Sequence, residues 1–374
     1  MIVQSLLHNS LAAFVQELNF LEQHHDVGTL LIFLPEGNDW PEQELNACLS
    51  LVSKPMIGGV FPQIIIDHQC SSQGAVLIGL KRTCAVQVLP LTEKLTADAL
   101  STQLTQWYPD QYEQDTLLVI ADGLASGLSC LIDELFNHFG LEINFVGGGA
   151  GSLTLVPKPC VITSKGLQQN VAAIAMMQCQ SGIGVAHGWE PITEAYRVTE
   201  SFNNQIISLN WQPAFQVYQQ VIHSHSQQTI NEDNFFTIAK AYPFGITKLG
   251  NELVIRDPIT TVENHLICVG DVPQGSFVHM MHGEISTLPL AAKAAKEKAL
   301  QSYPASDSAQ VQLFIDCISR VLFLDDRFSE ELNQAACDGI PMVGALTLGE
   351  IANCGQEYLE FYNKTAVVAL IKEI

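Results

Sequence analysis

The sequence is short of basic residues. It has 17 Lys and Arg against 39 Asp and Glu, which gives a net charge of −22 over 374 residues. Proteins bind nucleic acids and anionic lipid head groups mainly through clustered Lys and Arg. We therefore expect neither a nucleic acid nor a membrane surface among the partners, and the acidity itself favours solubility.

Long apolar runs are also missing. Hydrophobic residues make up 47% of the chain, but polar residues or glycines interrupt every apolar stretch. None reaches the roughly 18 residues that a membrane-spanning helix needs. The first residues, Met1-Ile2-Val3-Gln4-Ser5, lack the basic segment followed by an apolar one that a secretory signal has. We expect a protein of the cytoplasm.

The ten cysteines follow no metal-binding or disulfide pattern. The sequence has no Cys-x-x-Cys, which argues against structural zinc, iron–sulfur clusters and thioredoxin-like chemistry. It has no Cys-x-x-Cys-His either, which argues against covalently attached haem. Cys84, Cys130, Cys179 and Cys268 lie in apolar runs, as reduced and buried thiols do.

Motifs of common enzyme classes are absent as well. There is no Gly-x-Ser-x-Gly and no Gly-x-x-x-x-Gly-Lys-Ser/Thr. The run Gly147–Gly151 is not a Gly-x-Gly-x-x-Gly motif, and it closes a strand–helix–strand unit where a dinucleotide site would open one. We expect that the protein is not an enzyme. The alternative is a Cys317 nucleophile with a histidine supplied from elsewhere in the fold.

What the sequence does contain is one pattern in three copies. Each copy has an apolar strand, a helix and a second strand with glycine just inside it. The copies begin at Thr29–Pro35, Thr116–Asp122 and Val311–Cys317, and end in Pro55–Val60, Phe145–Gly151 and Pro341–Ala345. This repetition predicts internal pseudo-symmetry. Glycine within a strand indicates close approach, either of packed backbone or of a ligand, so Gly147, Gly148 and Gly344 are candidate ligand contacts.

These units predict an α/β (mixed α+β) protein with two interlocked halves around mixed sheets. Apolar strands are predicted at residues 160–163, 171–177, 183–187, 252–255 and 265–269, and amphipathic helices at residues 213–224 and 290–301. We expect an N-terminal helix in residues 1–24, one domain in residues 25–185 and the other in residues 186–374. No linker rich in Pro, Gly or Ser separates them, so they should pack tightly.

Several pieces, in this order, resemble the FIST family. Gly147–Gly151 is similar to the end of the family's N-terminal region, and the second half is similar to its C-terminal region. The matching pieces of that half are Gly188–Pro191, Arg197–Thr199, Asn210–Tyr218, Tyr242–Gly245, Ile255–Pro258, Asp316–Arg320, Glu330-Glu331, Gly344–Ile351 and Tyr362–Val368. Together the resemblance covers about residues 25–370. Gly344-Ala345 departs from it, because a bulkier residue is common after that glycine.

The resemblance implies a sensory input module of bacterial signalling that binds a small ligand. One branch of freestanding members, similar in length, binds haem b to sense nitric oxide. Those members act on a separate histidine kinase or an enzyme of cyclic-di-GMP synthesis or degradation. We identify no effector region in this chain, which agrees with action through such a partner. The alternative is a sensor of an amino acid or similar metabolite without haem, and a homodimer is compatible with either.

Candidate ligand-binding residues lie at the ends of strands. Arg256 and Asp257 are both candidates. Arg256 could hold a carboxylate through two parallel hydrogen bonds, unless the two residues pair with each other in a turn. Asp316, Cys317 and Arg320 lie at a strand end of the kind where α/β proteins collect ligands, although they could simply cap the next loop. Glu350 could bind a ligand ammonium or face solvent.

The haem hypothesis depends on the histidines. His187 ends an apolar strand just before Gly188-Trp189, whose ring could flank a porphyrin. One neutral imidazole is enough to bind haem iron, so His187 is the candidate iron ligand. In each case the alternative is an ordinary structural or surface histidine. Further pairs, whose spacing does not match a His-Glu-x-x-His zinc helix, are His223 with His225 and His279 with His282.

Overall fold

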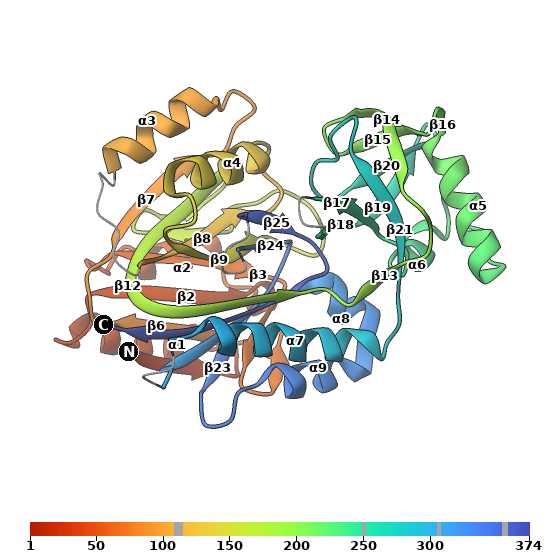
Figure 1. Cartoon of the computed structure of the whole chain (residues 1–374). Coiled ribbons are helices and arrows are strands. Elements are labelled where there is room, and N and C mark those ends of the chain that lie inside the picture. The colour runs from red at the N-terminus through yellow and green to blue at the C-terminus, as the bar shows by residue number, and fades with distance from the viewer. Residues whose placement is uncertain (108–114, 249–251, 305–307, 354–357) are drawn as a thin grey trace.

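The computed structural model describes residues 1–107, 115–248, 252–304, 308–353 and 358–374. Two stacked sheets with helices on their outer faces form a body, and a smaller sheet lies to one side of it (Figure 1). The α/β class predicted from the sequence is confirmed.

The first sheet belongs to the N-terminal part of the chain, and only its β2–β3 pair is parallel. In spatial order its strands are β1 (Ile2–Leu6), β6 (Ala75–Leu80), β2 (Thr29–Pro35), β3 (Met56–Phe61), β10 (Val161–Thr163) and β11 (Gly166–Gln168). Two helices, α1 (Leu11–Gln23) and α2 (Glu42–Leu49), cover its outer face. α1 begins after Ser10, whose side chain accepts the Ala13 N–H and so caps the helix.

The central sheet mixes strands from both ends of the chain. In spatial order these are β25 (Glu360–Tyr362), β24 (Glu350–Ala352), β9 (Asn144–Ala150), β8 (Asp115–Asp122), β12 (Val171–Ala186), β26 (Ala366–Glu373), β22 (Val311–Cys317), β23 (Met342–Thr347), β4 (Gln63–Ile66) and β5 (Gln69–Ser71), with β7 (Ala85–Pro90) also paired to β12. The two halves therefore interlock, as predicted. The boundary expected at residue 185/186 falls at the end of β12, within this shared sheet.

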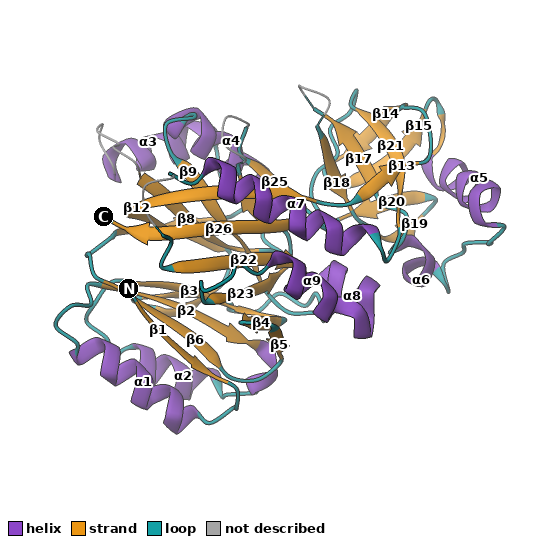
Figure 2. Cartoon of the chain, turned by 60° about the horizontal axis from the view of Figure 1, so that its bottom comes forward, coloured by secondary structure: helices purple, strands orange, loops and turns teal. Residues whose placement is uncertain are grey.

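The main core lies between the two sheets, and helices cover the far face of the central sheet (Figure 2). In β8, Leu118 and Ile120 face the first sheet, whereas Leu117 and Val119 face the helices. Burial on both faces explains why these strands are continuously apolar. The covering helices are α3 (Ala97–Trp107), α4 (Leu128–Phe139), α7 (Thr287–Ser302), α8 (Ile318–Leu324) and α9 (Phe328–Ala335). Short 3-10 helices at Glu36–Asn38 and Asp325–Arg327 precede α2 and α9.

The three copies of the sequence pattern form three parallel strand pairs, β2–β3, β8–β9 and β22–β23. In each pair the glycine lies opposite a residue in the middle of the first strand, as Ile32–Gly58, Val119–Gly147 and Phe314–Gly344. A Cβ atom on any of the three glycines would lie 1.8–1.9 Å from the carbonyl oxygen of that residue. Close approach of backbone explains these glycines, so the pattern does not require a ligand.

Residues 189–283 form an inserted unit between β12 and α7. The two ends of this unit lie side by side, because Trp189 pairs with Gly283. In spatial order its strands are β18 (Leu253–Arg256), β17 (Phe244–Thr247), β21 (Phe277–Gly283), β14 (Tyr196–Phe202), β15 (Gln205–Leu209), β20 (His265–Cys268) and β19 (Pro258–Val262), with β13 (Trp189–Pro191) on β21 and β16 (Gln212–Pro213) on β15. Helices α5 (Ala214–Ser226) and α6 (Phe235–Ala239) complete its own apolar core.

Candidate functional site: a buried polar centre

Six charged side chains meet where the inserted unit joins the body. We call this group the polar centre, and every member is at most 1% exposed. Its members are Asp257 of the inserted unit, Asp316 at the end of β22, Arg320 of α8, Glu331 of α9, Glu350 of β24 and Lys364 between β25 and β26. The structure thus brings together Asp257, Asp316, Arg320 and Glu350, which the sequence singled out separately. The sequence assigned no role to Glu331 and Lys364, although both lie in pieces that resemble the FIST family, Glu330-Glu331 and Tyr362–Val368.

Arg320 is held by protein groups on all sides. Its Nε lies 2.7 Å from Glu331 Oε1 and 3.2 Å from Asp316 Oδ1, and its Nη2 is also 2.7 Å from Glu331 Oε1. The remaining N–H groups donate to the backbone carbonyls of His187, Leu288 and Lys364. All five N–H donors of the guanidinium therefore have acceptors. Arg320 joins the ends of β12 and β25 to the start of α7, and its predicted contact with a ligand stays a prediction.

The polar centre has four carboxyl groups and only two cations. Burial, and next the charge of Glu331, raises the pKa of Asp316 well above its usual value. Burial raises the pKa of Glu350 to about 8. Burial also raises the pKa of Asp257 and of Glu331, so all four groups are shifted toward the protonated form, and protonation of part of them lets the remaining carboxylates balance Arg320 and Lys364. A buried group of charges is stable only when it is balanced in this way.

Asp257 connects the inserted unit to the body. Its Oδ2 lies 3.1 Å from Lys364 Nζ and accepts the Ser319 hydroxyl at 2.9 Å. Lys364 Nζ also donates to the carbonyl of Lys240 and lies 4.8 Å from the centroid of the Trp189 ring. The other carboxylate oxygen, Asp257 Oδ1, is buried and has no hydrogen-bond partner among the described residues. A buried acceptor without a donor is unfavourable, so this oxygen is available to a donor from a ligand.

Arg256 does not pair with Asp257, because neighbouring residues of an extended strand point to opposite faces. Its Nε donates to the carbonyl of Asp271, and its Nη1 donates to the carbonyls of Ile255 and Phe361, each at 2.9 Å. Nη2 has no hydrogen-bond partner in the part of the chain that the structure describes. A contact between this amino group of Arg256 and a ligand carboxylate stays a prediction.

Cys317 and Glu350 are neighbours at the edge of the polar centre. Burial, and next the nearby Glu350 carboxyl, raises the pKa of the Cys317 thiol well above its usual value. A nucleophile needs the thiolate, so this environment disfavours the Cys317 enzyme alternative. Glu350 is fully buried rather than facing solvent, and its carboxyl accepts from Thr347 Oγ1 and from the Thr365 N–H. Gly148 lies beside it, because Gly148 and Glu350 pair across β9 and β24.

His187 does not offer a free ring nitrogen to a haem iron. Burial, and next the charge of Arg320, lowers the pKa of His187 to about 4, so the ring is neutral at pH 7. Its Nδ1 accepts the Trp189 N–H at 3.0 Å. In a neutral ring the proton then lies on Nε2, and neither nitrogen has an available lone pair. The arrangement does not fit iron ligation by His187.

His279, on β21, has the opposite arrangement. Its Nδ1 lies 3.0 Å from the carbonyl oxygen of Thr193, which can only accept, so Nδ1 carries the proton. Nε2 therefore carries a lone pair, and it has no partner among the described residues. Metal-binding histidines are commonly held in this way, by a carbonyl on the other ring nitrogen. The sequence named His279 only for its spacing from His282 and gave no reason to prefer it.

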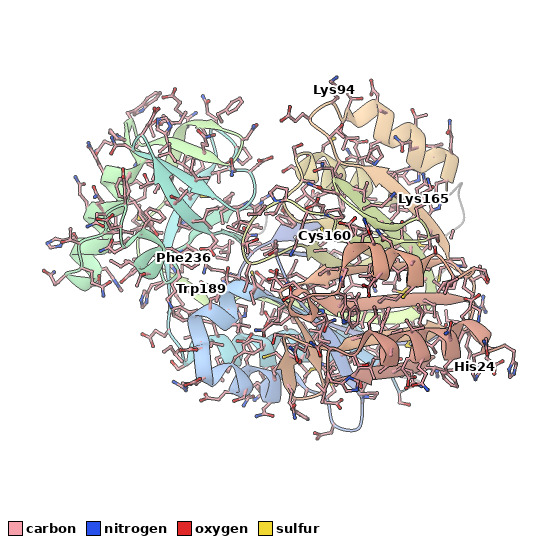
Figure 3. The ribbon with its side chains drawn as sticks, turned by 180° about the vertical axis from the view of Figure 1, so that it is seen from behind. His24, Lys94, Cys160, Lys165, Trp189 and Phe236 are labelled. Carbon is pink, nitrogen blue, oxygen red and sulfur yellow. The ribbon has the colours of Figure 1, made fainter. Side chains whose placement is uncertain are left out.

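Other possible sites lie away from the polar centre. His24, His25 and Asp26 could hold a metal ion, but Figure 3 shows His24 at the other end of the body from Trp189. An open groove of about 410 Å³ on the surface between α7 and α9 contains none of the candidate residues. The polar centre itself is shielded from solvent, because its members are at most 1% exposed.

Comparison with known protein families identifies the family of this chain. A FIST N domain matches residues 29–212 and a FIST C domain matches residues 214–353. Because these two matches cover most of its length, the chain belongs to the FIST family. FIST domains are sensory rather than catalytic and generally bind small ligands in signal transduction. The junction of the two domains falls inside the inserted unit, between β16 and α5, whereas the sequence suggested residue 185/186.

No curated protein matches the chain. Within the described part of the chain, no helix is both long enough and apolar enough to cross a membrane.

Proposed function

We propose that this protein senses a small polar ligand at the junction of the inserted unit and the body, and that the ligand donates an N–H group to Asp257. The observation that carries the proposal is the buried Asp257 Oδ1, which lacks a donor among the described residues. An amino acid is the ligand class that fits best. Its ammonium and carboxylate are complementary to the Asp257–Lys364 ion pair, because each end can replace one partner of that pair.

Ligand binding at this position changes how the inserted unit is held. Asp257 belongs to the inserted unit, whereas Ser319 and Lys364 belong to the body. A zwitterion between Asp257 and Lys364 replaces a direct contact with a bridged one, so the two parts shift relative to each other. Such a shift is a signal, because the ligand binds one arrangement of the two parts more tightly than the other.

Thermal unfolding in the presence of each of the amino acids tests this proposal. A ligand at one hundred times its Kd stabilises the folded state by about 2.7 kcal/mol, which is a measurable rise in Tm. We expect at least one amino acid to raise the Tm of the wild type and not that of Asp257→Asn. Asp233→Asn, on the exposed surface of the same unit, is the matched control and should respond like the wild type. If no amino acid changes the Tm, or if Asp257→Asn responds normally, the proposal is wrong.

Haem-dependent nitric-oxide sensing is a second candidate, which the FIST resemblance implies and which His279 favours. Bound haem b would supply an iron that binds nitric oxide. In this chain His279 presents a free ring nitrogen, whereas His187 does not. Absorption spectra after addition of haemin to the wild type, His187→Ala and His279→Ala test this. We expect a saturable Soret band that is lost in His279→Ala; loss in His187→Ala alone would assign the iron to His187, and no saturable band would exclude haem.

The family resemblance also supports a signalling partner. We propose that a histidine kinase or an enzyme of cyclic-di-GMP synthesis or degradation recognises the ligand-dependent arrangement of the two parts. Purified partner activity, measured with and without this protein and its ligand, tests the proposal. A partner whose activity does not depend on the ligand would contradict it.

A further inference from the structure

The outer end of the inserted unit carries no charge. Residues 201–231 contain no Asp, Glu, Lys or Arg, whereas at the chain average of 15% a stretch of this length would carry about five. The next longest uncharged stretch, residues 166–189, consists mainly of the buried strand β12. Residues 201–231 differ because many of them are exposed. We call their exposed surface, over α5 and the β15–β16 turn, the neutral face.

The neutral face presents two large aromatic side chains to solvent. Trp211 is 81% exposed and Phe202 is 66% exposed. Asn210 and Trp211 form the two-residue turn between β15 and β16, with φ of +47° and +66°. Left-handed backbone is unfavourable for tryptophan, and glycine is usual at this position. The Trp211 N–H donates to Thr199 Oγ1, so the turn is fixed and presents an exposed ring at some cost in stability.

Exposed charged residues adjoin the neutral face. The backbone of Arg197 forms hydrogen bonds with Asn210 of the turn, and Glu200 pairs with Ser208 across β14 and β15. The exposed residues at its margin are Arg197, Glu200, Glu232, Asp233 and Glu263. A centre depleted in charge, containing exposed aromatic residues and bordered by a charged rim, is typical of protein interfaces. Figure 1 shows α5 at the outer end of the inserted unit, away from the body, so the body does not cover this surface.

We propose that the neutral face is where two copies of this chain pair, with α5 of one copy against α5 of the other around a two-fold axis. Each copy carries a charge of −22, so two copies repel one another over most of their surfaces. Repulsion is weakest where neither surface carries charge. A basic partner gains nothing from an uncharged surface and would bind an acidic one, whereas a second copy provides a matching uncharged surface.

The composition of α5 fits this arrangement. Its apolar side, with Phe215, Tyr218 and Ile222, is buried in the inserted unit. Its outer side exposes Gln216 and Gln220, which can form hydrogen bonds across an interface without bringing charge into it. The helix has 13 residues and is therefore about 20 Å long, enough for several turns to pair with a second copy. This inference does not depend on the identity of the ligand.

Sedimentation equilibrium of the full chain tests the proposal. We expect the wild type to be a dimer. Gln216→Glu combined with Gln220→Glu places four carboxylates across the interface and should raise the dimer Kd about 100-fold, because facing like charges repel strongly. The matched control adds the same charge to the exposed side of α3, as Thr102→Glu with Gln106→Glu, and should remain a dimer. Trp211→Ala, which adds no charge, should also weaken the dimer.

Three results would overturn the inference. The first is that the wild type proves to be a monomer, whether or not the neutral face binds a different protein. Alternatively, the α5 variant remains a dimer, or the α3 variant dissociates as readily as the α5 variant, which would assign the effect to net charge alone. Circular dichroism confirms that each variant is folded before it is compared.

Discussion

Replacing Arg320 with leucine measures how much the polar centre contributes to stability. The substitution removes the donors of Glu331, of Asp316 and of three backbone carbonyls. The two carboxyl groups are fully buried, so water does not replace the lost donors. Breaking a buried ion pair by removing one partner costs about 3–5 kcal/mol. We expect the free energy of unfolding to fall by about 4 kcal/mol, a large part of the 5–15 kcal/mol typical of folded proteins.

Arg327 provides a matched control. It binds Glu330 through two hydrogen bonds of 2.7 and 2.8 Å, close in geometry to the Arg320–Glu331 pair. Both Arg327 and Glu330 are about half exposed, so water replaces the partner when it is removed. We expect Arg327→Leu to leave stability unchanged, because exposed ion pairs contribute little. The comparison separates the effect of burial from the effect of losing a charge.

Equilibrium unfolding in urea, monitored by tryptophan fluorescence, gives the free energy of unfolding of each variant. If Arg320→Leu is as stable as Arg327→Leu, the argument is refuted. Arg320→Lys provides a measurement even where Arg320→Leu fails to fold. It keeps the charge but loses the planar set of five donors, so its stability should lie between those of the wild type and Arg320→Leu.

Further predictions follow from the same structure. The pKa of Glu350 is about 8 in the folded state and near 4.5 when unfolded, so the protonated group stabilises the fold at low pH and this contribution is lost as the pH rises from about 4.5 to 8. The free energy of unfolding, measured across this pH range, should fall more steeply for the wild type than for Glu350→Gln. Equal slopes would contradict the assignment. Gly344→Ala should abolish soluble folding, because the added Cβ would lie 1.8 Å from a carbonyl oxygen, and expression followed by gel filtration would show this. In the control Gly275→Ala the added Cβ meets nothing within 4 Å, so the variant should lose only about 1–2 kcal/mol of stability for its left-handed backbone. Mass spectrometry after iodoacetamide treatment should find Cys48 modified and Cys317 intact, because Cys48 is partly exposed and Cys317 is buried. Rapid modification of Cys317 would reopen the enzyme hypothesis.

The sequence by itself determined the elements and much of the site. The apolar runs at Thr29–Pro35 and Val311–Cys317 became β2 and β22, and the repeated glycines marked the partner strand in each copy. These features are local, because an apolar run of strand length and a glycine at a close approach are both visible in a short window. Strand ends also indicated four members of the polar centre, since the ends of strands in α/β folds collect polar side chains.

Local pattern failed where packing decided the outcome. Residues 171–177 and 183–187 indicated separate strands, because the polar residues between them interrupt the apolar pattern. The structure has one strand, β12, over Val171–Ala186. Gly182 and Gly184 lie within it because α7 packs closely there, and a Cβ at either position would meet the helix backbone. A helix far along the chain is therefore the reason for those glycines.

Only the tertiary structure decided which charges meet. Arg320 binds the Glu331 carboxyl 11 residues away, but also the carbonyl of Lys364 at a separation of 44 residues and that of His187 at a separation of 133. Such contacts depend on the interleaving of strands from both ends of the chain in one sheet, which no local pattern encodes. The available nitrogen of a histidine is decided in the same way, because it depends on whether the other nitrogen meets a carbonyl, as in His279, or an N–H group, as in His187.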